Sequence, residues 1–221
     1  MCGRYVRFSD MSTFAELFSA KGKPAARPSY NIPPSSQVLV ARYDAHGQRE
    51  LALLKWGLVP SWSSEPRTEF STINARAETI ADKPAFRSAF KQRRCLIAAD
   101  GFFEWHKESD GHKQPYFFRL IGGHPFAFAG IWERWERDSM VLETCSIIVT
   151  VANEKMRPIH PRMPVILEPE DYDAWMDPKT SEAFKLQRFL RPMASERMEC
   201  HRAPVAVNNP KNDTIQLISP A

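Results

Sequence analysis

The second residue is a cysteine, and this position gives it chemistry that an internal cysteine lacks. Initiator methionine is removed when the next side chain is small, so the sequence predicts a mature chain that begins with Cys2. A free N-terminal cysteine is a 1,2-aminothiol, whose amine forms an imine with an aldehyde and whose thiolate then closes a thiazolidine ring. Reference pKa values of about 7.7–8.0 for the α-amine and about 8.5 for the thiol leave some amine neutral near pH 7. On its own, Cys2 also fits the plain interpretation that it merely follows the start codon.

Three other side chains can move protons or position an amine. Glu104 stands in an aromatic frame, Phe102-Phe103-Glu104-Trp105, and burial there would raise its pKa and suit it to proton transfer. His160 carries an imidazole, the side chain that exchanges protons near pH 7. The amide of Asn74 can accept from an ammonium and donate to a sugar oxygen. Each also has a structural interpretation, as a strand-edge carboxylate, a loop histidine and a turn residue.

Composition excludes several classes of protein. The chain has 221 residues, with Lys+Arg 30 and Asp+Glu 26, so its net charge of +4 does not mark a polybasic protein. No apolar run approaches the roughly 18 residues that span a bilayer. The N-terminus lacks the apolar stretch of a secretory signal, which predicts a cytoplasmic protein. Cysteines at 2, 95, 145 and 200 form no C-x-x-C pair, so neither a metal site nor a disulfide framework is expected.

Short apolar runs with hairpin-like punctuation predict strands at 37–43, 51–56, 95–99, 115–121, 126–132, 145–151 and 164–167. Helical patterning is confined to 10–19, 83–91, 169–176 and 178–190. The sequence therefore predicts an α+β fold, in which one domain over 1–221 holds a mostly antiparallel, curled or barrel-like sheet flanked by short helices. The basic run Lys91, Arg93 and Arg94 is interpreted as a solvated helix end outside the site.

Six motifs occur in a fixed order along the chain. They are Cys2-Gly3-Arg4-Tyr5, Tyr30-Asn31-Ile32-Pro33-Pro34, Trp56-Gly57-Leu58-Val59-Pro60, Asn74-Ala75-Arg76-Ala77-Glu78, Gly101-Phe102-Phe103-Glu104-Trp105 and His160-Pro161-Arg162-Met163-Pro164. With these motifs the chain resembles the SRAP family, the SOS response-associated peptidases, which sense abasic sites in single-stranded DNA. It departs from the family at Pro33, where alanine is more usual.

The resemblance implies a covalent DNA–protein crosslink, in which the N-terminal Cys2 captures the ring-opened abasic sugar as a thiazolidine. It also implies catalytic roles for Asn74, Glu104 and His160, with Asn74 positioning the α-amine. No cofactor is implied. The expected partner is abasic single-stranded DNA bound by a monomer, in the cytoplasm and at the nucleoid when on DNA.

The DNA contacts are expected from arginines and an aromatic loop. Arg4, Arg76 and Arg162 lie near the proposed catalytic positions, and a guanidinium fork suits phosphate. Trp56 and Trp62 flank Pro60, and we expect Trp62 outward for base stacking and Trp56 inward. The family motif adds Asn31 as a DNA-binding position.

Two other functions remain open at this point. An N-terminal-nucleophile peptidase or amidohydrolase would use Cys2 on a carbonyl, with its own amine or Glu104 as base, and autoproteolytic hydrolysis would accompany such chemistry. Lyase-like cleavage or reversal of the crosslink belongs instead to the abasic-site function. A scarcity of glycine, 9 residues, argues against a glycine-built oxyanion hole. A noncovalent single-strand-binding module would use only the arginines and the aromatic loop.

Overall fold

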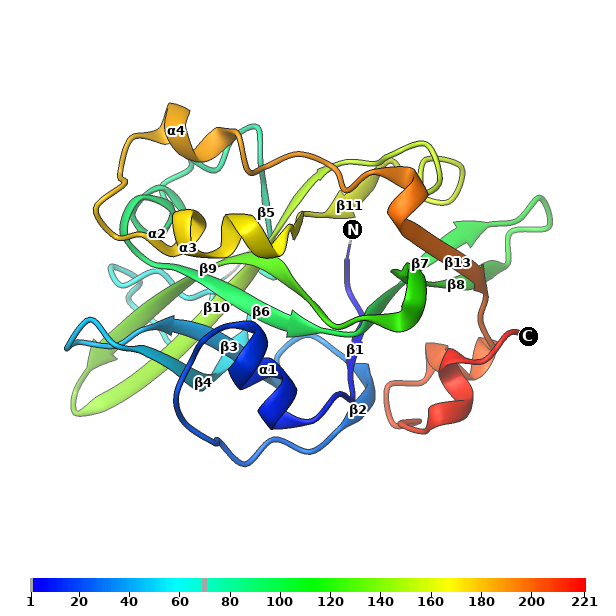
Figure 1. Ribbon diagram of the computed structural model, residues 1–221, viewed down its shortest axis with the longest axis horizontal. Coiled ribbons are helices and arrows are strands. Elements are labelled where there is room, and N and C mark those ends of the chain that lie inside the picture. Colours follow the sequence, from blue (N-terminus) through cyan, green and yellow to red (C-terminus); the bar gives the residue numbers. More distant parts are fainter. Residues whose placement is uncertain (1, 69–70) are drawn as a thin grey trace.

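The computed structural model describes residues 2–68 and 71–221 (Figure 1). The strands are β1 (Tyr5–Arg7), β2 (Ser29–Ile32), β3 (Gln37–Tyr43), β4 (Arg49–Trp56), β5 (Asn74–Arg76), β6 (Arg94–Ala99), β7 (Gly101–Lys107), β8 (Lys113–Leu120), β9 (Phe126–Arg137), β10 (Met140–Val151), β11 (Arg162–Pro164), β12 (Ile166–Leu167) and β13 (Met198–Arg202). The α-helices are α1 (Met11–Leu17), α2 (Arg87–Gln92), α3 (Tyr172–Met176) and α4 (Ala183–Gln187). Single turns of 3₁₀ helix are η1 (Ile121–Gly123), η2 (Pro169–Asp171), η3 (Ser195–Arg197), η4 (Val205–Asn208) and η5 (Ile215–Ile218).

Strands of the larger sheet close into a barrel. β10 pairs with β9, β9 with β6, β6 with β3 and β3 with β4, and β4 returns to β10. Within this ring the β4–β10 pair is parallel and the other pairs are antiparallel. β12 extends the sheet beside β9, while β5 and β11 lie beside β10. The predicted single domain, with a mostly antiparallel, barrel-like sheet and short helices, is confirmed.

A second antiparallel sheet holds the start of the chain. Its strand order is β13-β8-β7-β1-β2, so β1 lies between β7 and β2. Gly101 opens β7 opposite Val6. A Cβ at Gly101 would lie 2.4 Å from the Phe117 ring, so the strand can take this place only with glycine there. Pairing of β1 on both sides fixes the residues just before it, including Cys2.

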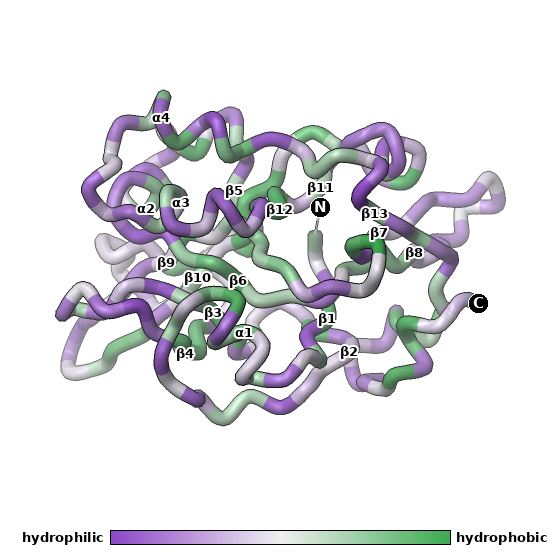
Figure 2. The backbone as a smooth tube through the Cα atoms, viewed as in Figure 1, coloured by the Kyte–Doolittle hydropathy of each residue, from purple (hydrophilic) through white to green (hydrophobic). Residues whose placement is uncertain are grey.

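Alternation along the strands divides the core into two faces. On β9, Phe126 and Phe128 belong to the cluster inside the barrel, whereas Ala127 and Ala129 belong to the cluster outside it. Residues of the helices, such as Trp175, join the outer cluster. Figure 2 shows hydrophobic residues concentrated in the central strands and hydrophilic residues along the peripheral loops. The helices therefore cover the barrel, while side chains fill its interior.

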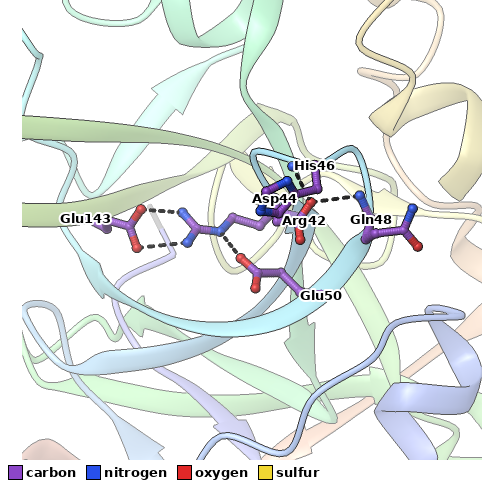
Figure 3. A network of polar contacts seen from close by, with 6 residues as sticks. All are labelled: Arg42, Asp44, His46, Gln48, Glu50 and Glu143. Carbon is purple, nitrogen blue, oxygen red and sulfur yellow. Dashed lines mark hydrogen bonds and ion pairs between the residues drawn. The ribbon is translucent and has the colours of Figure 1, made fainter.

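A buried cation crosses the barrel near the parallel seam, where β10 pairs with β4 through Thr144–Cys145. Arg42 donates to both carboxylate oxygens of Glu143, at 2.7 and 2.8 Å, and to Glu50 at 3.0 Å (Figure 3). Its guanidinium carbon lies 4.3 Å from the centre of the Trp132 ring. Two carboxylates and an aromatic face thus compensate the charge, and they join β3, β4, β9 and β10.

All the predicted strands are present, with β9 and β10 extending beyond their predicted ends and 164–167 divided between β11 and β12. The prediction missed β1, β2, β5, β7 and β13. β1, β2 and β5 are too short to show a pattern, and β13, with the sequence Met-Glu-Cys-His-Arg, has mixed polarity. These strands owe their form to pairing with neighbours distant in sequence.

Two predictions about helical segments are wrong in part. The expected helix over 178–190 is helical only at 183–187, because Asp177 ties the preceding residues into a turn through the amides of Lys179 and Thr180. The expected solvated run at 91–94 is also wrong for Arg94, which is 3% exposed. Its guanidinium donates to the backbone carbonyls of Phe90, Lys91, Trp175, Asp177 and Thr180.

Candidate active site around the second residue

Cys2 is buried where the two sheets meet. It has no exposed surface and packs in the interior cluster with Tyr5 and Phe102. Burial raises the pKa of the Cys2 thiol, and the negative charge of Glu104 raises it further. The thiol is therefore held protonated, so its use as a nucleophile requires a nearby group to take the proton.

Asn74 reaches Cys2 from the barrel. It begins β5, which runs parallel to β10 with Asn74 opposite Ile147. The Asn74 side-chain amide donates to the carbonyl oxygen of Cys2 at 2.8 Å. Its own oxygen, Oδ1, is buried and has no hydrogen-bond partner among the described residues. The contact differs from the predicted one with the α-amine, but it leaves an acceptor beside the terminus.

Glu104 lies on the same face of β7 as Phe102, because side chains two apart on a strand share a face. Phe102 is opposite Tyr5 of β1, so this face is turned toward the cluster that contains Cys2. The Glu104 side chain is 2% exposed. Burial raises the pKa of the Glu104 carboxyl, and the charge of His160 acts in the opposite direction.

His160 is held by the backbone that follows it. It precedes β11, whose Arg162 pairs with Val151 at the end of β10. The His160 ring nitrogen Nδ1 lies 3.0 Å from both the amide nitrogen and the carbonyl oxygen of Arg162. A neutral Nδ1 can accept from the amide and a protonated one can donate to the carbonyl. The ring orientation is thus supported in either charge state.

The predicted DNA-contacting residues fall into two groups. Arg76 is exposed at the end of β5, and Trp62 is 62% exposed. Arg162 is half-buried and pairs with Glu78. Trp56 is fully buried and donates to the Ile73 carbonyl at 2.8 Å, so the predicted orientations of Trp62 and Trp56 are both confirmed.

Arg4 and Asn31 are engaged inside the protein. Arg4 donates to Asn31 Oδ1 at 2.7 Å and to the Val207 carbonyl at 3.0 Å. The Asn31 side chain is buried and also donates to the carbonyls of Asn209 and Asn212, at 3.1 and 2.7 Å. Together they fasten the segment after β13 to β2, a role that the sequence did not suggest.

Sequence reasoning also missed two residues that touch the site. Glu78 forms an ion pair with Arg162. It is the last residue of the Asn74 motif, but no role was predicted for it. Tyr5 is fully buried against Trp56 and Phe128, at ring distances of 5.4 and 5.6 Å. The phenol oxygen of Tyr5 has no hydrogen-bond partner within the described ranges. Its motif position was visible in the sequence, but its burial was not.

A cavity of about 750 Å³ lies away from this site. It is lined by residues of α1, η1, η2 and η3, without any of the proposed catalytic side chains. No group of three or more His, Cys, Asp or Glu side chains in residues 2–68 and 71–221 could hold a metal ion. Across the same residues, no helix has the length and apolar character needed to cross a membrane.

The fold is a mostly antiparallel barrel joined to a second sheet, and it buries the second residue beside Asn74 and Glu104. The chain belongs to the SOS response associated peptidase (SRAP) family, whose sequence model matches residues 1–210. It is 39% identical over 222 residues to the Bacillus subtilis abasic site processing protein YoqW, covering 99% of each chain. It is 35% identical over 229 residues to the chicken abasic site processing protein HMCES, covering 88% of this chain and 66% of that protein.

Solved structures agree with this assignment of the fold. A crystal structure of a protein from Bacteroides thetaiotaomicron superposes with a TM-score of 0.88 at 27% identity, covering 100% of both chains. A second crystal structure, from Bordetella bronchiseptica, gives a TM-score of 0.80 at 25% identity and covers 92% of this chain and 100% of that chain. The whole chain therefore takes part in one family fold.

Proposed function

We propose that this protein processes abasic sites in single-stranded DNA by forming a covalent crosslink through a mature N-terminal Cys2. The observation that carries the proposal is that Asn74 bonds the carbonyl of the second residue and the Glu104 carboxyl acts on its thiol, while His160 acts on Glu104. The printed names of the relatives, abasic site processing proteins, supply the substrate class.

The reaction joins an aldehyde to the 1,2-aminothiol. Once Met1 is removed, the α-amine of Cys2 adds to the aldehyde carbon of the opened sugar, and the carbinolamine loses water to give an imine. The thiolate then adds to the imine carbon, and the nitrogen takes a proton, which closes the thiazolidine. The balance is one aldehyde and one aminothiol giving one ring and one water, without any oxidant or cofactor.

The buried side chains fit the proton transfers of this sequence. Glu104, whose pKa is raised by burial, can donate a proton to the departing hydroxyl and can then pass the thiol proton to the imine nitrogen as the ring closes. The buried oxygen of Asn74 can accept a hydrogen bond from the new α-amine and orient it. His160 can protonate the ring oxygen of the abasic sugar as the sugar opens to its aldehyde.

DNA would cross the surface that carries Arg76, Arg162 and Trp62. Two guanidinium groups beside the site suit phosphates on either side of the lesion. The exposed indole of Trp62 offers a face on which a neighbouring base can stack. Arg4 and Asn31 would support this surface without contacting DNA, because their side chains donate to the backbone carbonyls of Val207 and Asn209. We propose a monomer that acts in the cytoplasm and at the nucleoid when on DNA.

Three other activities would give different products. An N-terminal-nucleophile peptidase, which the family name suggests, would use the same Cys2 against a carbonyl. A lyase would cut the DNA strand at the lesion. A noncovalent single-strand-binding protein would need only the arginines and Trp62.

One experiment separates these functions. Protein whose Met1 removal has been verified by mass spectrometry is incubated with an abasic single-stranded oligonucleotide and run on a denaturing gel. We expect a shifted, heat-stable band, and none with the undamaged oligonucleotide or with the abasic site in a duplex. Binding without a denaturation-resistant band would support the noncovalent module instead. Strand cleavage without such a band would support a lyase.

A further inference from the structure

A second cavity lies at the far end of β1 from Cys2. Its volume is about 300 Å³, and residues 25–39 supply most of its wall. Its polar lining consists of Arg7, Arg27, Ser29, Asn31, Ser36, Gln37 and Asp213. None of the proposed catalytic or DNA-contacting residues lines it except the buried Asn31. The proposed function therefore leaves this cavity without a role.

Arg7 places a buried guanidinium at this cavity. It ends β1 and is 4% exposed. Its Nη2 donates to the backbone carbonyl of Arg27. No carboxylate oxygen of the described residues lies within ion-pair distance of it, in contrast to Arg42, which has two carboxylate partners. Burial lowers the pKa of Arg7, as expected for a cation that has lost water without gaining a full counter-charge.

Two carboxylates, one that acts on Arg7 and one that lines the cavity, accept hydrogen bonds from other donors. Asp100 raises the pKa of Arg7, but its oxygens accept from the amides of Phe8 and Ser9 and from the Ser9 hydroxyl. Asp213 lines the cavity, yet one of its oxygens accepts from the Ser29 hydroxyl and from the amide of Tyr30. Both carboxylates therefore organise loops rather than neutralise the guanidinium.

We propose that this cavity binds a phosphate group on Arg7. A guanidinium presents paired N–H donors that match phosphate oxygens, and it would gain the counter-charge that the protein does not supply. Ser36 and Gln37 add a hydroxyl and an amide along the wall. The cavity volume is at the lower end of the range for small-molecule sites, so it admits a phosphate with little more than a sugar attached. Free phosphate and the terminal phosphate of a DNA strand share this chemistry.

Thermal unfolding of the full chain tests the site with inorganic phosphate. Sodium phosphate is compared with sodium chloride at equal pH and ionic strength. We expect a saturable rise in the unfolding temperature, of about 2–4 °C when phosphate exceeds its dissociation constant roughly fivefold. Arg7→Met should lose this rise, while Arg137→Gln, which removes one positive charge from an exposed position, should keep it. The absence of a rise in the wild type, or an equal rise in Arg7→Met, would overturn the proposal.

A second variant keeps the test decisive if Arg7→Met does not fold. Gln37→Glu adds a carboxylate to the cavity wall while leaving Arg7 in place. It should weaken phosphate binding at least tenfold, because the new charge repels the anion and offers Arg7 an internal partner. Unchanged phosphate binding in Gln37→Glu would contradict the site.

Binding of undamaged oligonucleotides, which cannot form the crosslink, identifies the source of the phosphate. If a DNA end occupies the cavity, a 5′-phosphorylated strand binds more tightly than its 5′-hydroxyl counterpart, and inorganic phosphate removes the difference. If the cavity takes free phosphate, the two strands bind equally while the thermal response to phosphate remains. Neither measurement depends on Cys2, so failure of this site and failure of the crosslinking function are distinguishable.

Discussion

Two buried polar regions of this protein are built in opposite ways. Around Arg94, a buried cation donates to five backbone carbonyls and closes the ends of α2 and α3. Around Cys2, the buried oxygen of Asn74 has no partner among the described residues, and a thiol and a carboxyl are both held with raised pKa values. The first region satisfies every N–H donor of its guanidinium, whereas the second holds the Asn74 oxygen without a partner among the described residues.

The contrast between Arg94 and the surroundings of Cys2 distinguishes residues that stabilise this fold from residues that take part in its reaction. A fully bonded buried group costs stability when it is removed, because its partners are left without hydrogen bonds. A buried group that lacks a partner already carries that cost, and it persists where it serves a reaction. Changes at Arg94 should therefore unfold the protein without altering its chemistry, and changes around Cys2 should do the reverse.

The largest expected effect comes from blocking the removal of Met1. Any residue before Cys2 turns the reactive amine into an amide, which cannot form the imine. Protein with an uncleaved N-terminal extension should therefore lose the heat-stable crosslink completely, although Cys2 is still present. A denaturing gel with abasic single-stranded DNA measures this, and a stable band from the extended protein would refute the aminothiol mechanism.

Cys2→Ala is the matched control for the extension. It keeps the α-amine and removes the sulfur, so an imine can form but no ring can protect it from water. Borohydride should trap this imine on the gel, whereas untreated samples should show no band. The variant should remain folded, although it loses the stable crosslink.

Arg94→Met should have the next largest effect, and on stability alone. Loss of the guanidinium leaves several buried carbonyls without donors, and we expect a loss of roughly 3–5 kcal/mol in the free energy of unfolding. Urea denaturation measures it, with Arg134→Met as control because the exposed Arg134–Glu136 pair contributes at most about 1 kcal/mol. The crosslinking rate per folded molecule should stay at the wild-type value. A slower rate would place Arg94 in the chemistry.

Glu104→Gln should slow crosslink formation by about 10²-fold, the contribution typical of a general acid or base. Affinity for an undamaged single strand should remain unchanged, since Glu104 is buried. Single-turnover kinetics on denaturing gels, with fluorescence anisotropy for binding, separate the two. Wild-type rates in the variant would show that Glu104 carries no proton in the slow step.

The raised pKa of Glu104 also predicts the sign of a stability effect. Between the ordinary carboxyl pKa, about 4.3, and the raised one, the folded protein holds a proton that the unfolded chain has lost. Stability from this group is thus present at low pH and falls as pH rises through that window. Glu104→Gln should lack this fall, so its stability relative to the wild type should increase with pH. Urea denaturation across the pH range tests it, and a stability of Glu104→Gln that falls relative to the wild type as pH rises would contradict the raised pKa.

Trp62→Ala should have the smallest effect, restricted to DNA binding. The indole is exposed, so its removal should leave the free energy of unfolding within about 0.5 kcal/mol of the wild type. Loss of one stacked base should weaken binding of a single strand by about 1–3 kcal/mol. Fluorescence anisotropy measures this, with Phe184→Ala, another exposed aromatic side chain, as control. Equal affinities for the two variants would remove Trp62 from the DNA surface.

Sequence patterns predicted most of the barrel because an apolar run is a local feature. Each strand of the ring carries enough neighbouring apolar residues for the run to be visible, as on 37–43 and 126–132. The strands that hold the site, β1 and β5, have three residues each, and pattern cannot reveal them. They exist because β7, β2 and β10 offer backbone partners, and those partners come from elsewhere in the chain.

The sequence by itself determined which reactive groups are present: an aminothiol precursor at Cys2, a carboxyl at Glu104 in an aromatic frame, and an imidazole at His160. Residue type and position in the chain were sufficient, because the chemistry of each group belongs to the side chain. Only the tertiary structure decided that Asn74 bonds the carbonyl of Cys2, and that Arg94 is buried while Arg76 is exposed. Partner and burial depend on strands paired across 70 or more residues, such as β1 with β7 and β5 with β10, and this long-range pairing leaves no mark in the local sequence.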